Sequence, residues 1–129
     1  MRLSLAEARE IADRGISRAR DLNLCISIAV VDEFAQLVQL DRMDEAVLTS
    51  PEMAEAMTVT AMKFRLPTSE LTKLDPETLR NLQGIASFKM LPLQGAVLIV
   101  RGTTVVGAVG VSGASHAENE EIAAFAAAI

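Results

Sequence analysis

The chain has 129 residues, half of them hydrophobic and 22% charged, and its formal net charge at pH 7 is −5. That length suits a single domain, residues 1–129, whose core needs neither disulfides nor a metal. The acidic balance, with four Phe and no Tyr or Trp, argues against the common nucleic-acid surfaces, and no apolar run reaches the roughly 20 residues of a membrane span.

The mean hydropathy and the cysteine count bear on oligomerisation and on cellular location. The mean hydropathy of +0.31 is high for a small soluble monomer, so we expect a homo-oligomer, a dimer or larger, that buries part of this apolar surface. A single cysteine fits a reducing compartment, and Met1-Arg2 leads into a helix start without an apolar leader. We therefore expect a cytoplasmic protein.

The first part of the chain predicts a helix followed by a β-hairpin. Ser4-Leu5-Ala6-Glu7 matches a capping box, and apolar residues at helical spacing continue to about Leu22. Cys25–Val31 is an apolar run of strand length, which predicts a central strand. Asp32–Ala35 then turns the chain into Gln36–Arg42, a half-exposed partner strand.

A second helix is predicted at Ser50-Pro51, a cap followed by a proline at the first helical position. One face of this helix carries Met53, Met57, Thr60, Ala61 and Phe64. Because Val59 and Met62 point elsewhere, the helix is apolar on more than one side. The pattern favours core packing plus a subunit contact, and a Met-lined ligand groove is the alternative.

Prolines divide the segment that follows. Leu66–Ser69 ends the second helix, and Asp75-Pro76 starts a short third one. Ser87–Leu93 predicts a weak strand at the sheet edge, because Pro92 cannot donate to a hydrogen-bond ladder.

A hairpin and a helix complete the chain. Val97–Arg101 and Thr104–Ser112 flank a tight turn, which predicts two further strands. Gly107 and Gly110 lie inside the second of these strands and predict that a helix or a ligand approaches it closely. Ala117–Ile129 predicts the last helix. Its apolar face would carry Ile122, Phe125, Ala126 and Ile129. The order of elements predicts an α+β fold with an antiparallel sheet.

The candidate chemistry centres on His116, the only histidine, where the last strand meets the last helix. It could ligate haem iron or act as a general base, and the alternative is an exposed residue at a helix start. Asp32 ends a buried strand, so its carboxylate either accepts backbone hydrogen bonds in the turn or points into a site. In an enzyme, His116 and Asp32 would act as acid and base.

Other polar groups suggest binding rather than catalysis. Ser112–Ser115 before the last helix predicts an anion nest, in which backbone N–H groups hold a carboxylate or phosphate. Arg65 and Lys89 are candidate cations for a small carboxylate or a haem propionate. Cys25 fits a packed thiol better than a nucleophile. One His and one Cys provide no zinc-ligand spacing.

Four stretches form a single pattern along the chain: Ile28–Asp32 after an amphipathic helix, Arg42–Asp44, Phe64–Ser69, and Val106–Gly113 before an acidic helix. Together they resemble the GlcG/HbpS family, also called the haem-degrading or haem-binding DUF336 family. The resemblance covers nearly the whole chain in the right order, and GAVGVSG is its most specific part.

The resemblance implies a profilin-like sandwich, in which a five-stranded antiparallel sheet carries helices on both faces and subunits form dimers or larger rings. Some members bind haem, a related domain is fused to cobalamin adenosyltransferases of the PduO type, and others have no assigned reaction. The fold is therefore implied more firmly than the function.

The chain departs from the family pattern at four places near the implied pocket. Glycine pairs are replaced at Phe34-Ala35 and at Gly95-Ala96, a lysine at Met57, and a Gln-Asp pair at Glu118-Asn119. Each change removes a charge or a backbone freedom, so we expect the usual ligand to be lost or changed.

Two functions are consistent with these features. The first is an oligomeric, cytoplasmic protein that binds haem or a related tetrapyrrole between the second helix and the Gly-rich end of the last strand, with His116 on the iron. Its ligand-binding residues would be Ser112, Gly113, Ser115, His116, Met57 and Arg65. The second is a cofactor-independent enzyme, an isomerase, dehydratase or hydrolase, that acts on a small carboxylic or hydroxy acid in a catabolic or biosynthetic pathway.

Overall fold

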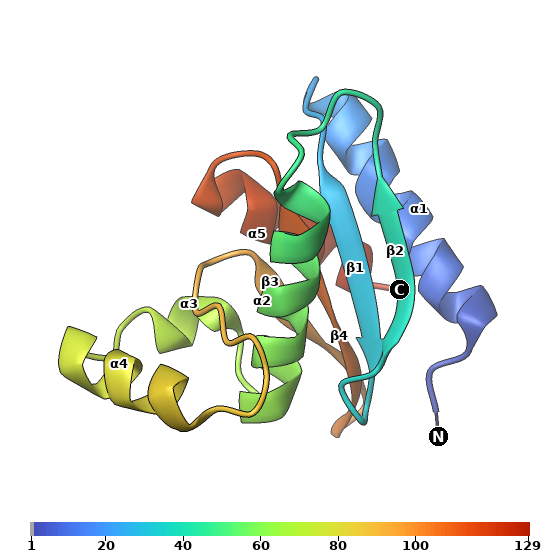
Figure 1. Ribbon diagram of the computed structural model, residues 1–129. Helices are drawn as coiled ribbons and strands as arrows, with labels where there is room; N and C mark the ends of the chain where they lie inside the picture. The colour runs from blue at the N-terminus through green and yellow to red at the C-terminus, as the bar shows by residue number, and fades with distance from the viewer. Residues whose placement is uncertain (1) are drawn as a thin grey trace.

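An antiparallel sheet with helices on both of its faces organises the chain (Figure 1). The computed structural model describes residues 2–129. The elements are α1 (Leu5–Asp21), β1 (Ser27–Asp32), β2 (Leu37–Arg42), α2 (Ser50–Phe64), α3 (Thr68–Leu71), α4 (Pro76–Ile85), β3 (Ala96–Arg101), β4 (Thr104–Ser112) and α5 (His116–Ala127). The expected α+β fold is confirmed. None of the helices in the described residues is long and apolar enough to cross a membrane.

The sheet has four strands in the order β2-β1-β4-β3, so the fifth strand expected at Ser87–Leu93 is wrong. Side chains, rather than a neighbouring strand, satisfy the backbone of this segment. Leu91 N–H donates to Thr60 Oγ1 at 2.9 Å, and Gln83 Nε2 donates to the Met90 carbonyl at 3.3 Å. With Pro92 near its end, the segment forms a loop that packs on α2 and α4 instead of extending the sheet.

Strands β1 and β4 are the two central strands, as the apolar runs predicted. They pair antiparallel over the full length of β1, from Ser27 opposite Ser112 to Asp32 opposite Gly107. The hairpin partners β2 and β3 form the two edges. This register determines which predicted site residues share an end of the sheet.

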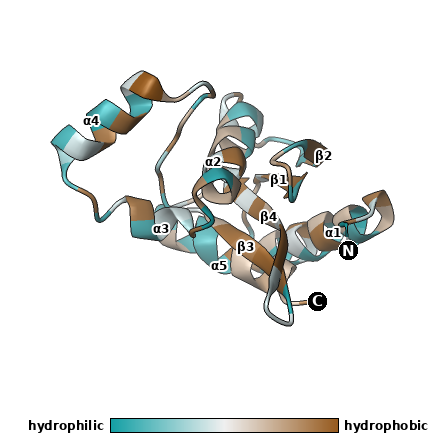
Figure 2. Ribbon diagram, turned by 90° about the horizontal axis from the view of Figure 1, so that it is seen from below, coloured by the Kyte–Doolittle hydropathy of each residue, from teal (hydrophilic) through white to brown (hydrophobic). Residues whose placement is uncertain are grey.

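The core lies on both sides of the sheet. Helices α1 and α5 cover one face, where Ile11 and Ile122 pack with Ile28 of β1. Helix α2 covers the other face, where Met57 packs with Ala108 of β4. Figure 2 shows the sheet between these two helix layers, with α4 set apart from both.

Helix α2 lies against the sheet at Gly110, whose missing side chain leaves room for it. A Cβ atom at this position would overlap Thr58 Oγ1 and would lie 3.3 Å from the Ala54 carbonyl oxygen. The close approach predicted for this glycine is confirmed, and the element that approaches is a helix. Thr58 Oγ1 is held in place because it donates to the Ala54 carbonyl at 2.6 Å.

Helix α5 is anchored on α1 through its C-terminal half. Ile122 and Ala126 are buried as expected, but Phe125 is 42% exposed, and Ile129 lies past the end of the helix and is exposed. Phe125 instead carries the guanidinium of Arg14 over its ring, 4.5 Å from the centroid. An Arg18 hydrogen bond holds the pKa of Glu121 below its usual value. These exposed pairs contribute little to stability individually.

We predict that Gly110→Ala destabilises the protein by about 1–3 kcal/mol, because the new methyl group must displace the Thr58 side chain. The measurement is equilibrium denaturation. Gly84→Ala is the matched control: a Cβ there meets nothing within 4 Å, so this helical substitution should stabilise the protein slightly. In the double variant with Thr58→Ala, the cost of Gly110→Ala should fall; strictly additive costs would contradict this explanation.

Candidate functional site

The structure places the two predicted catalytic residues at opposite ends of the sheet. Asp32 ends β1 opposite Gly107, whereas His116 follows β4, whose last residue Ser112 lies opposite Ser27. Five residues of strand separate these ends, or about 17 Å at the usual rise per residue. Asp32 and His116 therefore do not form one acid–base pair.

Asp32 has the structural role that we gave as one alternative. Its Oδ1 accepts the backbone N–H groups of Phe34 at 2.9 Å and Gln36 at 3.1 Å. These bonds close the turn of the β1–β2 hairpin. Ala35, at one of the departures from the family glycines, has φ 60°, a left-handed conformation that glycine adopts at lower cost.

The predicted anion nest at Ser112–Ser115 is largely occupied by the chain's own acceptors. Ala114 N–H donates to Asn119 Oδ1 at 3.0 Å, and Ser115 N–H donates to Glu118 Oε1 at 3.1 Å. In return, Glu118 N–H donates to Ser115 Oγ at 3.2 Å, which completes a capping box. The spacing of Glu118 from Ser115 is that of a capping pair, so the sequence already carried a signal for this contact.

The other predicted ligand-binding residues do not come together. His116 is exposed at the first turn of α5, and Ser112 is buried. Met57 is only 1% exposed and packs in the core under α2. Arg65 caps the far end of α2 in a left-handed conformation. The space expected between α2 and the Gly-rich end of β4 is filled by the α2 side chains themselves.

A groove on the outer side of α2 is the better candidate site, and we call it the α2 groove. It consists of two adjoining hollows of about 300 and 370 Å³, which is the size range of small-molecule sites. Its lining residues are Thr49, Glu52, Met53, Glu55, Ala56 and Val59 along α2, and Phe88, Lys89, Met90 and Leu91 of the loop.

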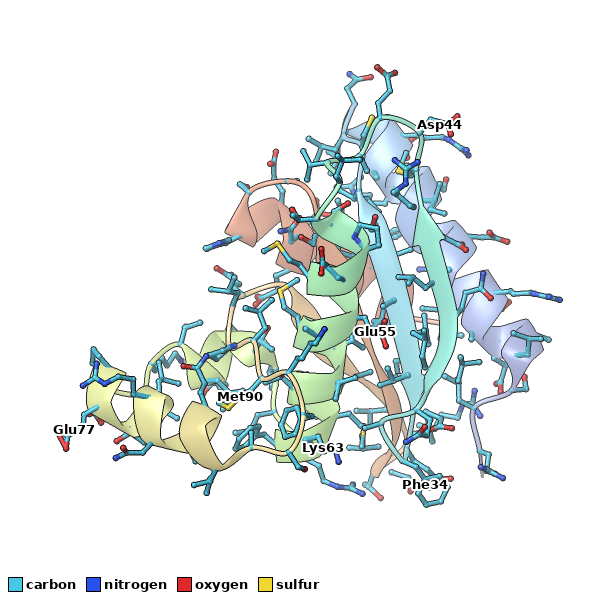
Figure 3. The ribbon with its side chains drawn as sticks, in the orientation of Figure 1. Phe34, Asp44, Glu55, Lys63, Glu77 and Met90 are labelled. Carbon is cyan, nitrogen blue, oxygen red and sulfur yellow. The ribbon has the colours of Figure 1, made fainter. Side chains whose placement is uncertain are left out.

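The α2 groove combines an apolar floor with charged groups at its rim. Met53 from the helix and Met90 from the loop supply thioethers, so a Met-lined groove, the alternative given for this helix, is present. Lys89 is the cation of the loop, and Lys63 lies over the Phe88 ring, 5.4 Å from its centroid. Figure 3 shows Met90 between α4 and α2.

Sequence reasoning missed most of the groove. It singled out Met53 and Lys89, but not Glu52, Glu55 or Phe88. The missing information was the position of the loop at 86–95, within which the sequence predicted a strand at Ser87–Leu93. The only available signal was the surplus of apolar residues around α2.

A third hollow of about 460 Å³ lies between α1 and the end of β2. Its charged residues are balanced, with Arg20 and Arg42 beside Asp41 and Asp44. Arg42 donates to the Ala46 carbonyl at 3.4 Å, and Asp41 accepts from Gln39 Nε2 at 2.7 Å. The hollow thus shows no preference for either sign of charge. Within residues 2–129 there is no group of three or more His, Cys, Asp or Glu that could hold a metal ion.

Known proteins resemble the chain over almost its whole length. The family model for haem degrading protein HbpS-like matches residues 3–128. The crystal structure of a PduOC:heme complex superposes with a TM-score of 0.90 at 25% identity, covering 99% of this chain and 94% of that one. A double mutant of HbpS from Streptomyces reticuli superposes with a TM-score of 0.89 at 29% identity, covering 99% and 86%.

One sequence relative is much longer. The corrinoid adenosyltransferase PduO of Citrobacter freundii is 29% identical over 130 residues, which cover 99% of this chain but 39% of that protein. The chain thus spans about two fifths of this relative's length.

We predict that Asn119→Ala destabilises the protein by about 1–3 kcal/mol, whereas His116→Ala changes stability by less than about 0.5 kcal/mol. Asn119 is 4% exposed and bonds the Ala114 backbone in both directions, so its removal leaves the partly buried N–H and carbonyl of Ala114 without these partners. His116 is exposed at the same helix start and is the matched control. Thermal and urea denaturation measure the stability of both variants. Equal losses of stability would contradict the conclusion that the Asn119 side chain holds the turn before α5 in place.

Proposed function

Because the chain belongs to the HbpS-like family, we propose that it binds haem or a related tetrapyrrole in the α2 groove. The observation that supports this proposal is the groove itself, an apolar slot with thioethers on its floor and a lysine at its rim. Some relatives bind haem, as the PduOC:heme complex records.

The residues of the α2 groove suit haem in three respects. Ala56, Val59 and Phe88 offer an apolar wall for the face of a macrocycle. Lys89 is placed to pair with a propionate. Met53 and Met90 carry thioether sulfurs, one of which would be the iron ligand. Haem iron would supply Lewis-acid and redox chemistry when bound.

Two features of the groove restrict how haem can lie. Glu52 and Glu55 repel the haem propionates, so the propionates would point away from these glutamates and toward Lys89. The groove has no histidine, so ligation by His116 would require haem to lie at the start of α5 instead. Met57, the departure from the family lysine, is in the core and would not contact haem in the groove.

Self-association and a cytoplasmic location belong to the same proposal. Large apolar side chains remain exposed, with Leu48 at 88% and Ile85 at 83%, which favours burial between copies of the chain. The thiol of Cys25 is free and exposed, so the packed thiol expected from the sequence is wrong, because Cys25 precedes β1 instead of lying within it. A reducing compartment preserves such a free thiol. The alternative of an enzyme acting on a small carboxylic acid has less support, because its acid and base lie apart.

We predict saturable haem binding by the apo protein, followed by its visible absorption spectrum. Either Met53→Leu or Met90→Leu should change the axial-ligand spectrum, because leucine keeps the volume but lacks the sulfur. Met43→Leu, outside the groove, is the control and should leave the spectrum unchanged. A spectrum changed only by His116→Ala would move the site to the start of α5, and nonspecific partitioning alone would refute haem binding.

We further predict that Lys89→Met weakens haem binding by roughly 3- to 10-fold, because it removes an exposed charge-assisted bond to a propionate. The axial-ligand spectrum should not change. Raising the salt concentration should reduce the difference between the two proteins. Lys73→Met, which removes an exposed lysine outside the groove, is the matched control. If it weakened haem binding as much as Lys89→Met, the loss would reflect the net charge of the protein and not a contact between Lys89 and a propionate.

A further inference from the structure

Helix α4 forms an arm that the rest of the chain covers only in part. None of the ten residues in Pro76–Ile85 is buried, and Figures 1 and 2 show the helix standing away from the sheet and from α2. Its N-terminus is well capped, since Asp75 accepts the Thr78 N–H at 3.1 Å. A helix of this length is marginal in water without packing, so the arm requires a covering surface.

The arm has an apolar stripe suited to such a surface. Leu79, Leu82 and Ile85 recur every three residues and so lie along one side of the helix. Leu79 and Leu82 are half-buried, and Ile85 is 83% exposed. Ile85 is therefore the residue of the stripe that gains most from a partner, and Leu79 and Leu82 have less apolar area left to bury.

The α2 groove matches the arm in length. Its lining residues on α2 extend from Thr49 to Val59, about 15 Å of helix, and the ten residues of α4 also span about 15 Å. The arm of the same chain contacts the loop wall of the groove, since Gln83 Nε2 donates to the Met90 carbonyl, but no residue of α4 is among the residues that line the groove. The complementary surface is consequently that of another copy.

The charges of the arm and the groove are complementary in one orientation. Helix α2 has Glu52 and Glu55 toward its start and Lys63 in its last turn. The arm begins with Asp75 and Glu77, and Arg80 follows one turn later. An arm antiparallel to α2 would place its acidic start near Lys63 and turn Arg80 toward the glutamates. Antiparallel helix dipoles favour the same orientation.

We propose that α4 of one copy lies in the α2 groove of a second copy, and that the second copy's arm lies reciprocally in the groove of the first. Twofold symmetry forms the contact twice. The contact between the two copies rests on the self-association proposed above, and only the competition described next also rests on haem binding. Since haem would occupy the same groove, haem and the second copy's arm compete, and the ligand controls assembly.

The test is sedimentation of the apo protein across a concentration series. The double variant Leu79→Glu and Leu82→Glu in the arm should raise the dimer dissociation constant at least about tenfold. Ala56→Lys in the groove should raise it by a similar factor. The new lysine lies four residues after Glu52, a spacing at which the two side chains can form an ion pair that supports the helix. Asn81→Glu adds a charge to the exposed part of the same helix and should have little effect. Circular dichroism checks that each variant folds.

Mixing the two defective proteins distinguishes this contact from a pairing of two arms. In a mixed dimer, the intact arm of the Ala56→Lys protein lies in the intact groove of the protein with Leu79→Glu and Leu82→Glu. One contact is therefore retained, and the mixture should dimerise more tightly than either variant alone. Lack of rescue, or a groove substitution without effect, would overturn the proposed seating. A monomeric wild type would refute self-association itself. In wild-type dimers, haem should raise the monomer fraction; haem binding without dissociation would refute competition.

Discussion

The close contact between α2 and Gly110 is the constraint on which the rest of the structure depends. Because Gly110 has no side chain, the helix packs directly on a central strand, and Thr58 and Met57 fill the space between them. This side of the sheet is consequently closed. On this side of the sheet, the space for a ligand lies on the outer side of α2, where the loop at 86–95 forms a second wall.

Helix α2 therefore serves two environments at once. Met57 belongs to the core, and Met53, one turn earlier, belongs to the groove. The sequence shows both as one apolar helix, and only the placement of the sheet separates them. The same two-sidedness relates haem binding to assembly in our proposals, since the outer side of α2 is the surface for both.

Much of the fold could be predicted from local patterns, and the site could not. The capping box at Ser4 and the apolar run of β1 depend on neighbouring residues, so periodicity identifies them. The segment Ser87–Leu93 depends on a contact between Leu91 and Thr60, 31 residues apart in the sequence, and was wrongly expected to be a strand. The expectation that Asp32 and His116 act together is wrong, because the register of β1 and β4 places them at opposite ends of the sheet.

The loop beside α2 has a consequence for how such proteins diversify. Hydrogen bonds between its backbone and the side chains of Thr60 and Gln83 hold the loop in place, and the loop contributes no strand to the sheet. Substitutions in Phe88–Leu91 can thus reshape the groove without disturbing the ladder that holds the domain together. Ligand preference can then evolve independently of fold stability, which permits one scaffold to acquire new specificities through a few changes in a single segment.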